Sequence, residues 1–465
     1  MTAHFSCQEI VLATGGQLRQ RGAWQHFVGI STDSRTTQAG QLFIPLIGEK
    51  HDGHDFLKRA CERGTGGVLV AETWWRSHFR ALPPDVTVIS VPDTLTALGD
   101  LARSWRQRFS LPVVAITGSC GKTTTKEMAA QIAWAAYRVL KNELNFNNLI
   151  GLPQTLLTLS ATHQVVIVEM GMNRFGEIRR LAQIAVPTIG VLTNIYPAHT
   201  EGVGDIEGVG RAKAELLEAL AENRLLIYNQ DDQRLARLVQ RFPGLTLSFG
   251  LSAQAQVRGR KRRCHGLQGQ EVEFRWQGRY WPIFLKISGL HHLYNSLAAA
   301  AVGLALGLSP AEIIAGLESF EPLDKRTQLI TLKSGVHIIN DSYNANPGSM
   351  AMALRTLADL RNQGRAAAAL GDMLELGSVA VQAHQQLGEQ ACRHNLDLLV
   401  AYGDYRDQVA EAARASGMAA NQVYAVASQA EGVRVLKAFL KPGDWLLVKG
   451  SRGMRMENLI HALGP

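Results

Sequence analysis

Apolar and polar positions alternate along the chain in a way that predicts strands followed by helices. The clearest apolar segments are short and rich in β-branched residues, as at 113–116 and 164–171, and such runs are typical of buried parallel strands. From Thr124 onward the apolar spacing is that of a helix, so we expect a strand-to-helix turn just before it. Repeated strand–helix alternation predicts an α/β fold.

The alternation falls into three blocks, which predict three domains. Residues 1–92 mix short strands and helices and predict a small α/β head. A helix expected at about 94–109 leads into the block 93–320, which we expect to form a central parallel-sheet, P-loop ATPase-like domain. The block 321–465 alternates again and predicts a C-terminal Rossmann-like domain. A length of 465 residues fits three domains of ~150 residues each.

Composition predicts a cytoplasmic protein. No stretch of ~20 uninterrupted apolar residues is present, and the first sixteen residues lack the basic and apolar regions of a signal peptide. The five cysteines are scattered, without a C-x-x-C pair, which predicts reduced thiols rather than a disulfide framework or zinc site.

The formal charge of +8 raises the question of nucleic acid, and the basic run RGRKRR at 258–263 is the candidate patch. Alternating segments flank this run as they would in a hairpin, and no aromatic stacking platform accompanies it. We therefore expect a solvated edge and no nucleic-acid partner. The positive charge also suits a polyanionic small-molecule substrate.

The turn at 117–123 reads T-G-S-C-G-K-T and predicts a phosphate-binding loop. Backbone N–H groups at a helix N-terminus attract anions, Lys122 adds a positive charge, and the Thr123 hydroxyl is placed to ligate Mg²⁺. The longer G-x-x-x-x-G-K-[ST] pattern is not met, because Ile116 stands where it requires glycine. A plain glycine-rich turn with a surface lysine is the alternative, but the order of strand, turn, lysine, hydroxyl and helix favours phosphate binding.

Two further apolar strands end in polar side chains. Glu169 ends one, and Asn194 and His199 follow the next. The carboxyl ends of strands in an open α/β sheet line one crevice, so we expect these groups to converge with the phosphate loop. Glu169 then holds Mg²⁺ opposite Thr123, the alternative being a helix cap or a salt bridge.

His199, followed by a helix that carries Lys213, suggests a corner for a second metal ion. An ammonium group cannot ligate a cation, so Lys213 fits this corner only when it is carbamylated. Otherwise Lys213 is expected to be an exposed helix lysine.

With these motifs the chain resembles the Mur ligases over essentially its whole length. The resemblance rests on STDSR in the first block, on TGSCGKTTTKE, NFNNLIGLPQTLL, EMGMNRFGEI, TNIYPAHTEGVG and GLHHLYNSLAAA in the second, and on NDSYNANPGSM, GDMLELG and VKGSRGMRMENL in the third. EMGMNRFGEI, NDSYNANPGSM and GDMLELG are specific to one branch of that family.

The resemblance implies ATP and Mg²⁺ as cofactors. It implies that Gly118, Ser119, Cys120, Gly121, Lys122, Thr123 and Thr124 cradle the ATP phosphates, with Thr123 and Glu169 on one Mg²⁺ and His199 and carbamylated Lys213 on a second. It further implies that Asn148 approaches the γ-phosphate, Asn295 reads adenine, and Arg326 and Asp341 close on phosphate and ribose. It also implies that the uridine nucleotide of the substrate is bound by Ser31, Asp33, Ser34 and Arg35.

The activity implied by this branch is the joining of D-alanyl-D-alanine to UDP-N-acetylmuramoyl-tripeptide through an acyl phosphate, by a monomer that works in the synthesis of peptidoglycan precursors. Diaminopimelate and lysine are both compatible as the third residue of the tripeptide. The rival activities are addition of the third amino acid, folylpolyglutamate synthesis, and nucleotide-driven switching by a regulatory P-loop ATPase. Two positions depart from the family pattern: His292 replaces an asparagine, and Lys325 precedes Arg326 where this branch usually has glycine.

Overall fold

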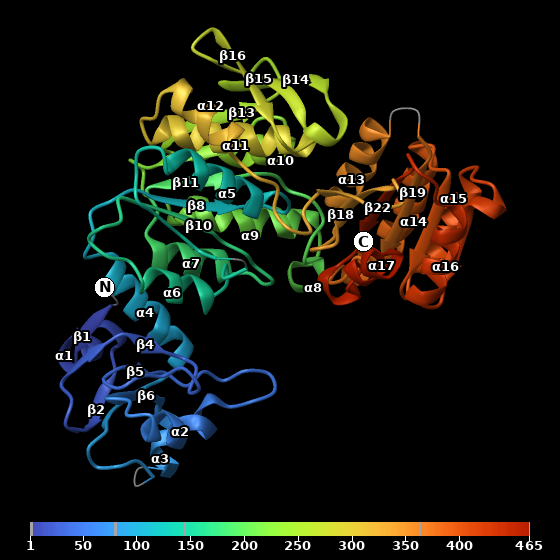
Figure 1. Cartoon of the computed structure of the whole chain (residues 1–465). Helices are drawn as coiled ribbons and strands as arrows, with labels where there is room; N and C mark the ends of the chain where they lie inside the picture. The colour runs from blue at the N-terminus through green and yellow to red at the C-terminus, as the bar shows by residue number, and fades with distance from the viewer. Residues whose placement is uncertain (1–2, 79–80, 144, 362–363, 465) are drawn as a thin grey trace.

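The computed structural model describes residues 3–78, 81–143, 145–361 and 364–464, with the side chains of 261 and 262 left aside. Three α/β domains follow one another along the chain, coloured blue, light blue and teal through green to yellow, and orange to red in Figure 1. The predicted fold class is therefore confirmed. Among the described residues, no helix combines the length and the apolar character needed to cross a membrane.

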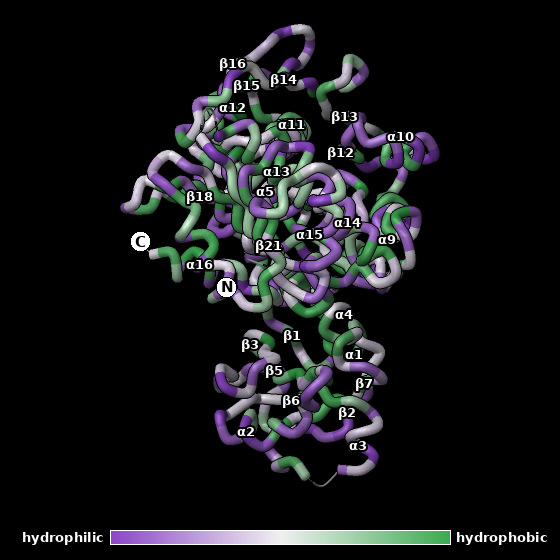
Figure 2. Tube along the Cα trace, turned by 90° about the vertical axis from the view of Figure 1, so that its right-hand side faces the viewer, coloured by the Kyte–Doolittle hydropathy of each residue, from purple (hydrophilic) through white to green (hydrophobic). Residues whose placement is uncertain are grey.

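The head is built on a five-stranded sheet in the order β2-β7-β6-β5-β4, and it lies below the other two domains in Figure 2. A separate antiparallel pair, β1 with β3, lies next to the central domain. The strands are β1 (His4–Ser6), β2 (Gln17–Gln20), β3 (His26–Val28), β4 (Ile30–Ser31), β5 (Leu42–Phe43), β6 (Gly67–Ala71) and β7 (Thr87–Val91), and the helices are α1 (Cys7–Thr14), η1 (Gly53–Phe56), α2 (Leu57–Glu62) and α3 (Glu72–His78).

The central domain contains a nine-stranded sheet in the order β16-β15-β14-β13-β12-β11-β8-β10-β9. The strands from β9 to β14 pair in parallel, and β14, β15 and β16 form an antiparallel extension. The strands are β8 (Val113–Thr117), β9 (Val139–Lys141), β10 (Val165–Glu169), β11 (Ile189–Leu192), β12 (Leu225–Asn229), β13 (Leu245–Gly250), β14 (Val257–Cys264), β15 (Gln270–Trp276) and β16 (Arg279–Leu285). A short helix, η2 (Gly266–Gln268), connects β14 to β15.

Helices cover both faces of this sheet, which explains why its inner strands are apolar at nearly every position before their carboxyl ends. Val114 and Ile116 of β8 pack toward one helix layer, and Val113 and Ala115 pack toward the other. The first layer comprises α5 (Lys122–Ala133), α11 (Leu290–Ala305) and α12 (Pro310–Glu318); the second comprises α4 (Thr94–Arg106), α6 (Gly151–Leu156), α7 (Glu177–Ala185) and α9 (Ile206–Ala219). Two shorter helices, α8 (Thr200–Val203) and α10 (Gln233–Val239), complete the domain.

The basic run at 258–263 forms most of strand β14, between β13 and β15, so the expectation of an edge was wrong, whereas Arg260 and Arg263 are exposed to solvent as expected. The expected hairpin is present, because β14 and β15 are antiparallel neighbours. Arg260 forms an ion pair of 2.8 Å with Glu273 of β15 and lies over the ring of Tyr280. Part of the positive charge of this run is therefore paired with a carboxylate on the neighbouring strand.

The C-terminal domain has a six-stranded sheet in the order β17-β18-β22-β19-β20-β21, parallel except for the edge strand β17. Asp341, the last residue of β18, is in register with Lys449, the last residue of β22. The strands are β17 (Gln328–Thr331), β18 (His337–Asp341), β19 (Ala366–Gly371), β20 (Leu398–Tyr402), β21 (Val423–Val426) and β22 (Trp445–Lys449). The helices are α13 (Pro347–Leu360), η3 (Gly377–Val379), α14 (Ala380–Arg393), α15 (Arg406–Ala415), η4 (Ala420–Gln422), α16 (Gln429–Phe439), η5 (Arg452–Met454) and α17 (Glu457–Leu463).

Candidate active site

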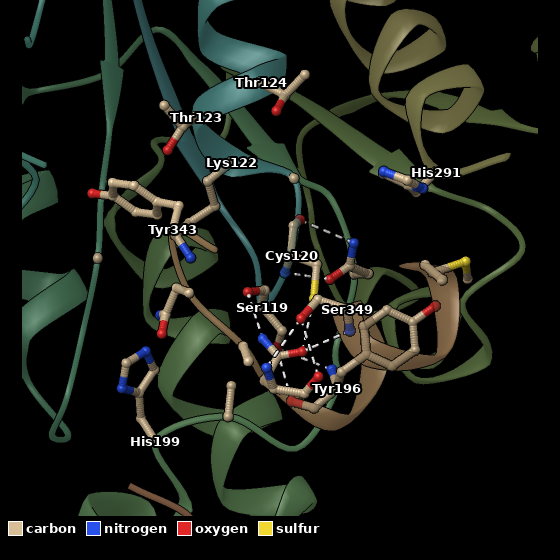
Figure 3. Close-up of a pocket in the computed structure, with 18 of the residues that line it drawn as sticks. Ser119, Cys120, Lys122, Thr123, Thr124, Tyr196, His199, His291, Tyr343 and Ser349 are labelled. Atoms are coloured by element: carbon tan, nitrogen blue, oxygen red, sulfur yellow. Dashed lines mark hydrogen bonds between the residues drawn. The ribbon is translucent and has the colours of Figure 1, made fainter. Parts of the chain in front are cut away.

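A cavity of about 940 Å³ lies between the central and C-terminal domains, where the carboxyl ends of strands from both sheets meet. Figure 3 shows part of its wall, with the phosphate loop above and His199 and Tyr343 to one side. Twelve of the predicted site residues line this cavity: Ser119, Cys120, Gly121, Lys122, Thr123, Thr124, Asn148, Glu169, His199, Asn295, Arg326 and Asp341. Gly118 and Lys213 lie behind the wall, and the four predicted residues of the head lie elsewhere.

The phosphate loop is held by two glycines in left-handed conformations. Gly118 has φ +152°, and a Cβ there would lie 1.9 Å from the hydroxyl of Thr193. Gly121 has φ +80°, and a Cβ there would lie 2.2 Å from the side-chain oxygen of Asn295. No other residue type fits at these positions. The loop is further fixed because the backbone N–H of Cys120 donates to Asn194 at 2.8 Å.

Helix α5 begins at Lys122, two residues earlier than the apolar spacing indicated, so the lysine and the three threonines that follow it belong to its first turn. The Nζ atom of Lys122 donates to the carbonyl of Gly118 at 2.9 Å and so curls back over the loop. The start of the helix and the ammonium group thus face the cavity from one side, an arrangement that attracts a polyphosphate.

Glu169 is buried and points at Thr123. Its Oε2 accepts a hydrogen bond of 2.6 Å from the Thr123 hydroxyl, and its Oε1 accepts one of 2.7 Å from Asn147. Asn142 pairs with its backbone through both side-chain atoms. Among the described residues Glu169 forms no ion pair and caps no helix, so neither alternative expectation describes it. Sequence reasoning missed Asn147, although it precedes Asn148 in the same motif.

The hydroxyl of Thr123 and the carboxylate of Glu169 are hard oxygen donors, as Mg²⁺ requires. In the part of the chain that the structure describes, no group of three or more His, Cys, Asp or Glu side chains could hold a metal by itself. Mg²⁺ is usually bound through one or two protein oxygens together with substrate phosphates and waters, and Thr123 and Glu169 supply two such oxygens side by side.

Asn148 lies on the cavity wall, and its side chain is engaged locally. Its Oδ1 accepts hydrogen bonds from the backbone N–H groups of Ile150, at 3.1 Å, and Gly151, at 2.8 Å, at the start of α6. With the carbonyl oxygen so occupied, the amide N–H₂ group is the part of this side chain that is available to a ligand.

Lys213 lies on α9 with 2% of its surface exposed, so it is not the exposed helix lysine of the alternative interpretation. Burial, reinforced by the positive charge of Lys122, lowers the pKa of Lys213 well below its ordinary value. In the described structure its amine forms no hydrogen bond or ion pair. A neutral buried amine beside the phosphate loop is the form that can react with carbon dioxide to give a carbamate.

His199 faces the C-terminal domain. Its Nδ1 lies 2.5 Å from Oε2 of Glu375, in the loop after β19. The next residue, Thr200, donates its hydroxyl to the carbonyl of Leu376 at 2.8 Å. The hydrogen bond of His199 lowers the pKa of Glu375 below its usual value. Glu375 stands in the branch-specific motif GDMLELG, but no pattern in the sequence joined it to His199.

The C-terminal wall carries Arg326 and Asp341. The guanidinium of Arg326 lies 3.8 Å from the ring centroid of Tyr343, and that of Arg452 lies 5.1 Å from the same ring. Oδ1 of Asp341 accepts the backbone N–H of Thr327 at 3.0 Å, and Oδ2 accepts Nζ of Lys449 at 2.5 Å. Tyr343, Lys449 and Arg452 were not predicted.

Lys325 replaces the glycine that is usual in this branch of the family, and its backbone has a conformation that glycine adopts readily. Lys325 has φ +57°, in the left-handed region that favours glycine, so the usual residue of this branch suits the turn and the lysine bears some strain. Its ammonium pairs with Glu457 at 2.9 Å, which anchors the segment beside Arg326 to α17.

The region expected to read adenine is buried. The Thr125 hydroxyl donates to the Oδ1 of Asn295 at 3.4 Å, and the same oxygen contacts Gly121. Its neighbours His291 and His292 also line the cavity. Burial lowers the pKa of His291 to about 4 and that of His292 well below its ordinary value, which favours the neutral form of both rings. Neither nitrogen of His292 has a hydrogen-bond partner in the described structure.

The C-terminal domain also contacts the phosphate loop directly. Asn346 caps α13 by accepting the N–H of Ser349 at 2.9 Å, and the thiol of Cys120 donates to the same side-chain oxygen at 3.1 Å. Burial raises the pKa of this thiol. One asparagine therefore joins the start of a C-terminal helix to the loop of the central domain.

The head segment predicted to hold a uridine nucleotide is separate from this cavity. Arg35 is 72% exposed and forms a bidentate ion pair with Asp33, with a shortest distance of 2.7 Å. This pairing lowers the pKa of Asp33 to about 2. The Ser31 hydroxyl donates to the backbone of Asp33, and Ser34 is buried. The segment touches the central domain where Gln154 of α6 donates to Thr32 at 2.7 Å.

Three family models match the chain in order. They are the Mur ligase family, catalytic domain, at residues 26–106; the Mur ligase middle domain at 116–303; and the Mur ligase, glutamate ligase domain, at 325–452. Together they span most of its length. The chain belongs to the Mur ligase family and is an ATP-dependent ligase.

Similar curated proteins carry a single activity in their names. The chain is 35% identical to the UDP-N-acetylmuramoyl-tripeptide–D-alanyl-D-alanine ligase of Bacillus subtilis, covering 94% of this chain and 93% of that one. It is 33% identical to the protein of the same name from Escherichia coli, covering 93% of both.

Solved structures agree with this relationship. MurF from Acinetobacter baumannii superposes with a TM-score of 0.90 at 30% identity, over 99% of both chains. MurF from Thermotoga maritima, solved in complex with ADP, superposes with a TM-score of 0.83 at 27% identity, over 93% of this chain and 96% of that one.

Proposed function

We propose that this enzyme joins D-alanyl-D-alanine to UDP-N-acetylmuramoyl-tripeptide, with ATP converted to ADP and phosphate, as a cytoplasmic monomer in the synthesis of peptidoglycan precursors. The observation that carries the proposal is the cavity itself. It combines a phosphate loop, a buried carboxylate beside a threonine hydroxyl, and a second wall with two arginines that no described carboxylate neutralises.

Each domain takes one part of the reaction. The head, residues 1–92, binds the uridine nucleotide through Ser31, Asp33, Ser34 and Arg35. The central domain, residues 93–320, binds ATP, with Lys122 and Asn148 on the phosphates and Asn295 on adenine. The C-terminal domain, residues 321–465, brings Arg326 to phosphate and Asp341 to ribose, and accepts the dipeptide.

The chemistry explains why the cavity needs so much positive charge. A free carboxylate does not form a peptide bond at a useful rate, so it first takes the γ-phosphoryl group of ATP and becomes an acyl phosphate. That step brings one anion against another, and catalysis therefore consists of positioning and charge neutralisation. Lys122 and the start of α5 supply these to the phosphoryl group. The amine of the dipeptide then attacks the acyl carbon, and the tetrahedral intermediate releases phosphate.

Mg²⁺ would be held at the pair formed by Thr123 and Glu169, and it supplies further charge neutralisation to the phosphates when bound. A second ion would be held by His199 and by Lys213 in its carbamylated form. The lowered pKa of Lys213 supports this role, since only a neutral amine forms a carbamate. The C-terminal wall excludes water and so protects the acyl phosphate from hydrolysis.

The test is phosphate release measured with ATP, Mg²⁺ and UDP-N-acetylmuramoyl-tripeptide, with and without D-alanyl-D-alanine. We expect release to depend on the dipeptide and to match amide product one for one. L-Alanyl-L-alanine is the matched control, and diaminopimelate or glutamate as acceptor tests the rival ligase activities. Phosphate release that ignores every acceptor would favour a switching ATPase instead.

A further inference from the structure

Two short segments from different domains meet at the rim of the cavity, and we call them together the latch: residues 199–201 of the central domain and residues 375–377 of the C-terminal domain. Three contacts join them. Nδ1 of His199 lies 2.5 Å from the carboxylate of Glu375, the Thr200 hydroxyl donates to the carbonyl of Leu376, and the backbone N–H of Glu201 donates to the carbonyl of Glu375 at 3.2 Å.

Both members of the side-chain pair adopt a backbone conformation that non-glycine residues rarely take. His199 has φ +55° and Glu375 has φ +62°. Such conformations are unfavourable and persist where the surroundings require them, often at functional sites. Gly377 has φ +52°, and a Cβ there would lie 3.2 Å from Cα of Glu201. The two segments of the latch therefore approach each other closely along their whole length.

The strength of the contact between the two side chains does not by itself explain this arrangement. The side chain of Glu375 is 55% exposed and that of His199 is 28% exposed. Even a fully charged pair contributes little at this exposure, too little to offset two unfavourable backbone conformations. The stabilisation that this side-chain pair provides therefore does not account for it.

What the contact does fix is the imidazole ring. A carboxylate that accepts the Nδ1–H of histidine selects one tautomer and one ring orientation, and leaves Nε2 as a lone-pair donor. This is the arrangement of metal-binding histidines, in which the second ring nitrogen almost always donates to a carboxylate, a carbonyl or water. Here the carboxylate belongs to the other domain.

We propose that Glu375 is a positioning residue: by orienting His199 across the domain boundary, it completes the second cation site only when the C-terminal domain is docked. Phosphoryl transfer would then wait until the domain that accepts the dipeptide is in place. The inference rests on the proposed function for its metal site, but the contact between Glu375 and His199 stands on the geometry of this chain.

The test uses Mn²⁺ in place of Mg²⁺, with ADP present, and counts bound ions by electron paramagnetic resonance. In Glu375→Ala we expect the affinity for the second Mn²⁺ to fall about 10- to 100-fold, while the first, at Thr123 and Glu169, binds unchanged. In the isosteric Glu375→Gln, whose amide oxygen still accepts a hydrogen bond, we expect a smaller loss. Glu389→Gln, a paired carboxylate on α14, is the matched control and should behave as wild type.

Steady-state kinetics give a second readout, since a mispositioned ligand lowers kcat while the KM for ATP changes little. Unaltered binding of the second Mn²⁺ in both Glu375 variants would overturn the inference, and so would an equal loss of both ions. These outcomes are separate from the test of function. Wild-type enzyme that releases phosphate only with the dipeptide, together with unaltered Mn²⁺ binding in the variants, leaves the ligase activity standing and removes only the role of Glu375.

Discussion

The phosphate loop and the head segment 31–35 are both expected to bind phosphate-bearing ligands, yet they are built differently. The loop is fixed before any ligand arrives, because Gly118, Gly121 and Asn194 determine its shape and Lys122 already lies over it. In the head segment, the arginine is held by a carboxylate two residues away and extends into solvent. The loop is therefore a preorganised site, whereas Arg35 must exchange its partner when it binds a ligand.

A preorganised site should lose the most when its charge is removed. We expect Lys122→Ala to lower kcat by at least about 10³-fold, because the lysine neutralises charge that develops on the transferring phosphoryl group. The fold should be unaffected, as checked by thermal unfolding. Lys333→Ala, at an exposed position of the C-terminal domain, is the control. If Lys122→Ala retained its activity, the phosphate loop would have no larger catalytic role than the head segment, contrary to our prediction.

The buried lysine behind the loop comes next in expected effect. Lys213→Ala should lower activity about 10²-fold if its carbamate supplies an oxygen ligand, and added acetate should restore part of that activity by filling the vacated position. Activity with and without acetate is the measurement. If Lys213→Ala had wild-type activity without acetate, Lys213 would not supply a ligand, and the preorganised site would be limited to the phosphate loop.

Arg35→Ala tests the head. We expect the KM for the uridine nucleotide substrate to rise about 10-fold and the KM for ATP to stay unchanged, because the two ligands bind in different domains. Arg76→Ala is the matched control, since Arg76 is also an exposed, ion-paired arginine of the head. A change in the KM for ATP instead would contradict the separation of the two sites.

The smallest effect concerns the ion pair within the head segment. Asp33 should titrate with a pKa of about 2, and Arg35→Ala should return it toward its ordinary value of 3.8. Since the folded-state pKa is the lower one, any stability from this pair is present above about pH 4 and is lost as the pH falls toward 2. A carboxyl ¹³C NMR titration measures the shift. An unshifted Asp33 in wild type would mean that Arg35 is already free to bind.

The loop was predictable because its chemistry is contiguous. Glycines, lysine and threonine stand within seven residues between an apolar strand and a helix, so local pattern alone indicated their arrangement. The convergence of Glu169 with Thr123 also followed, since parallel strands place their carboxyl ends together. The α/β class followed from the same alternation of strands and helices.

Contacts between distant segments were not predictable. Asn346 at Cys120 and Glu375 at His199 join residues more than 170 positions apart, and their proximity depends on how two domains dock. No periodicity encodes that docking. The basic run at 258–263 misled for a related reason: its charges suggested an edge, but sheet order is set by which strands pair, and Arg260 finds its carboxylate on the next strand.

The sulfur in the phosphate loop has a consequence for the chemical durability of the enzyme. Thiols react with peroxides and alkylating agents as thiolates, and burial keeps Cys120 protonated by raising its pKa. A cysteine in the middle of a catalytic loop is thus shielded from oxidative damage, and cysteine-directed inhibitors would react with it slowly unless they first bind in the cavity and bring their electrophile to the sulfur.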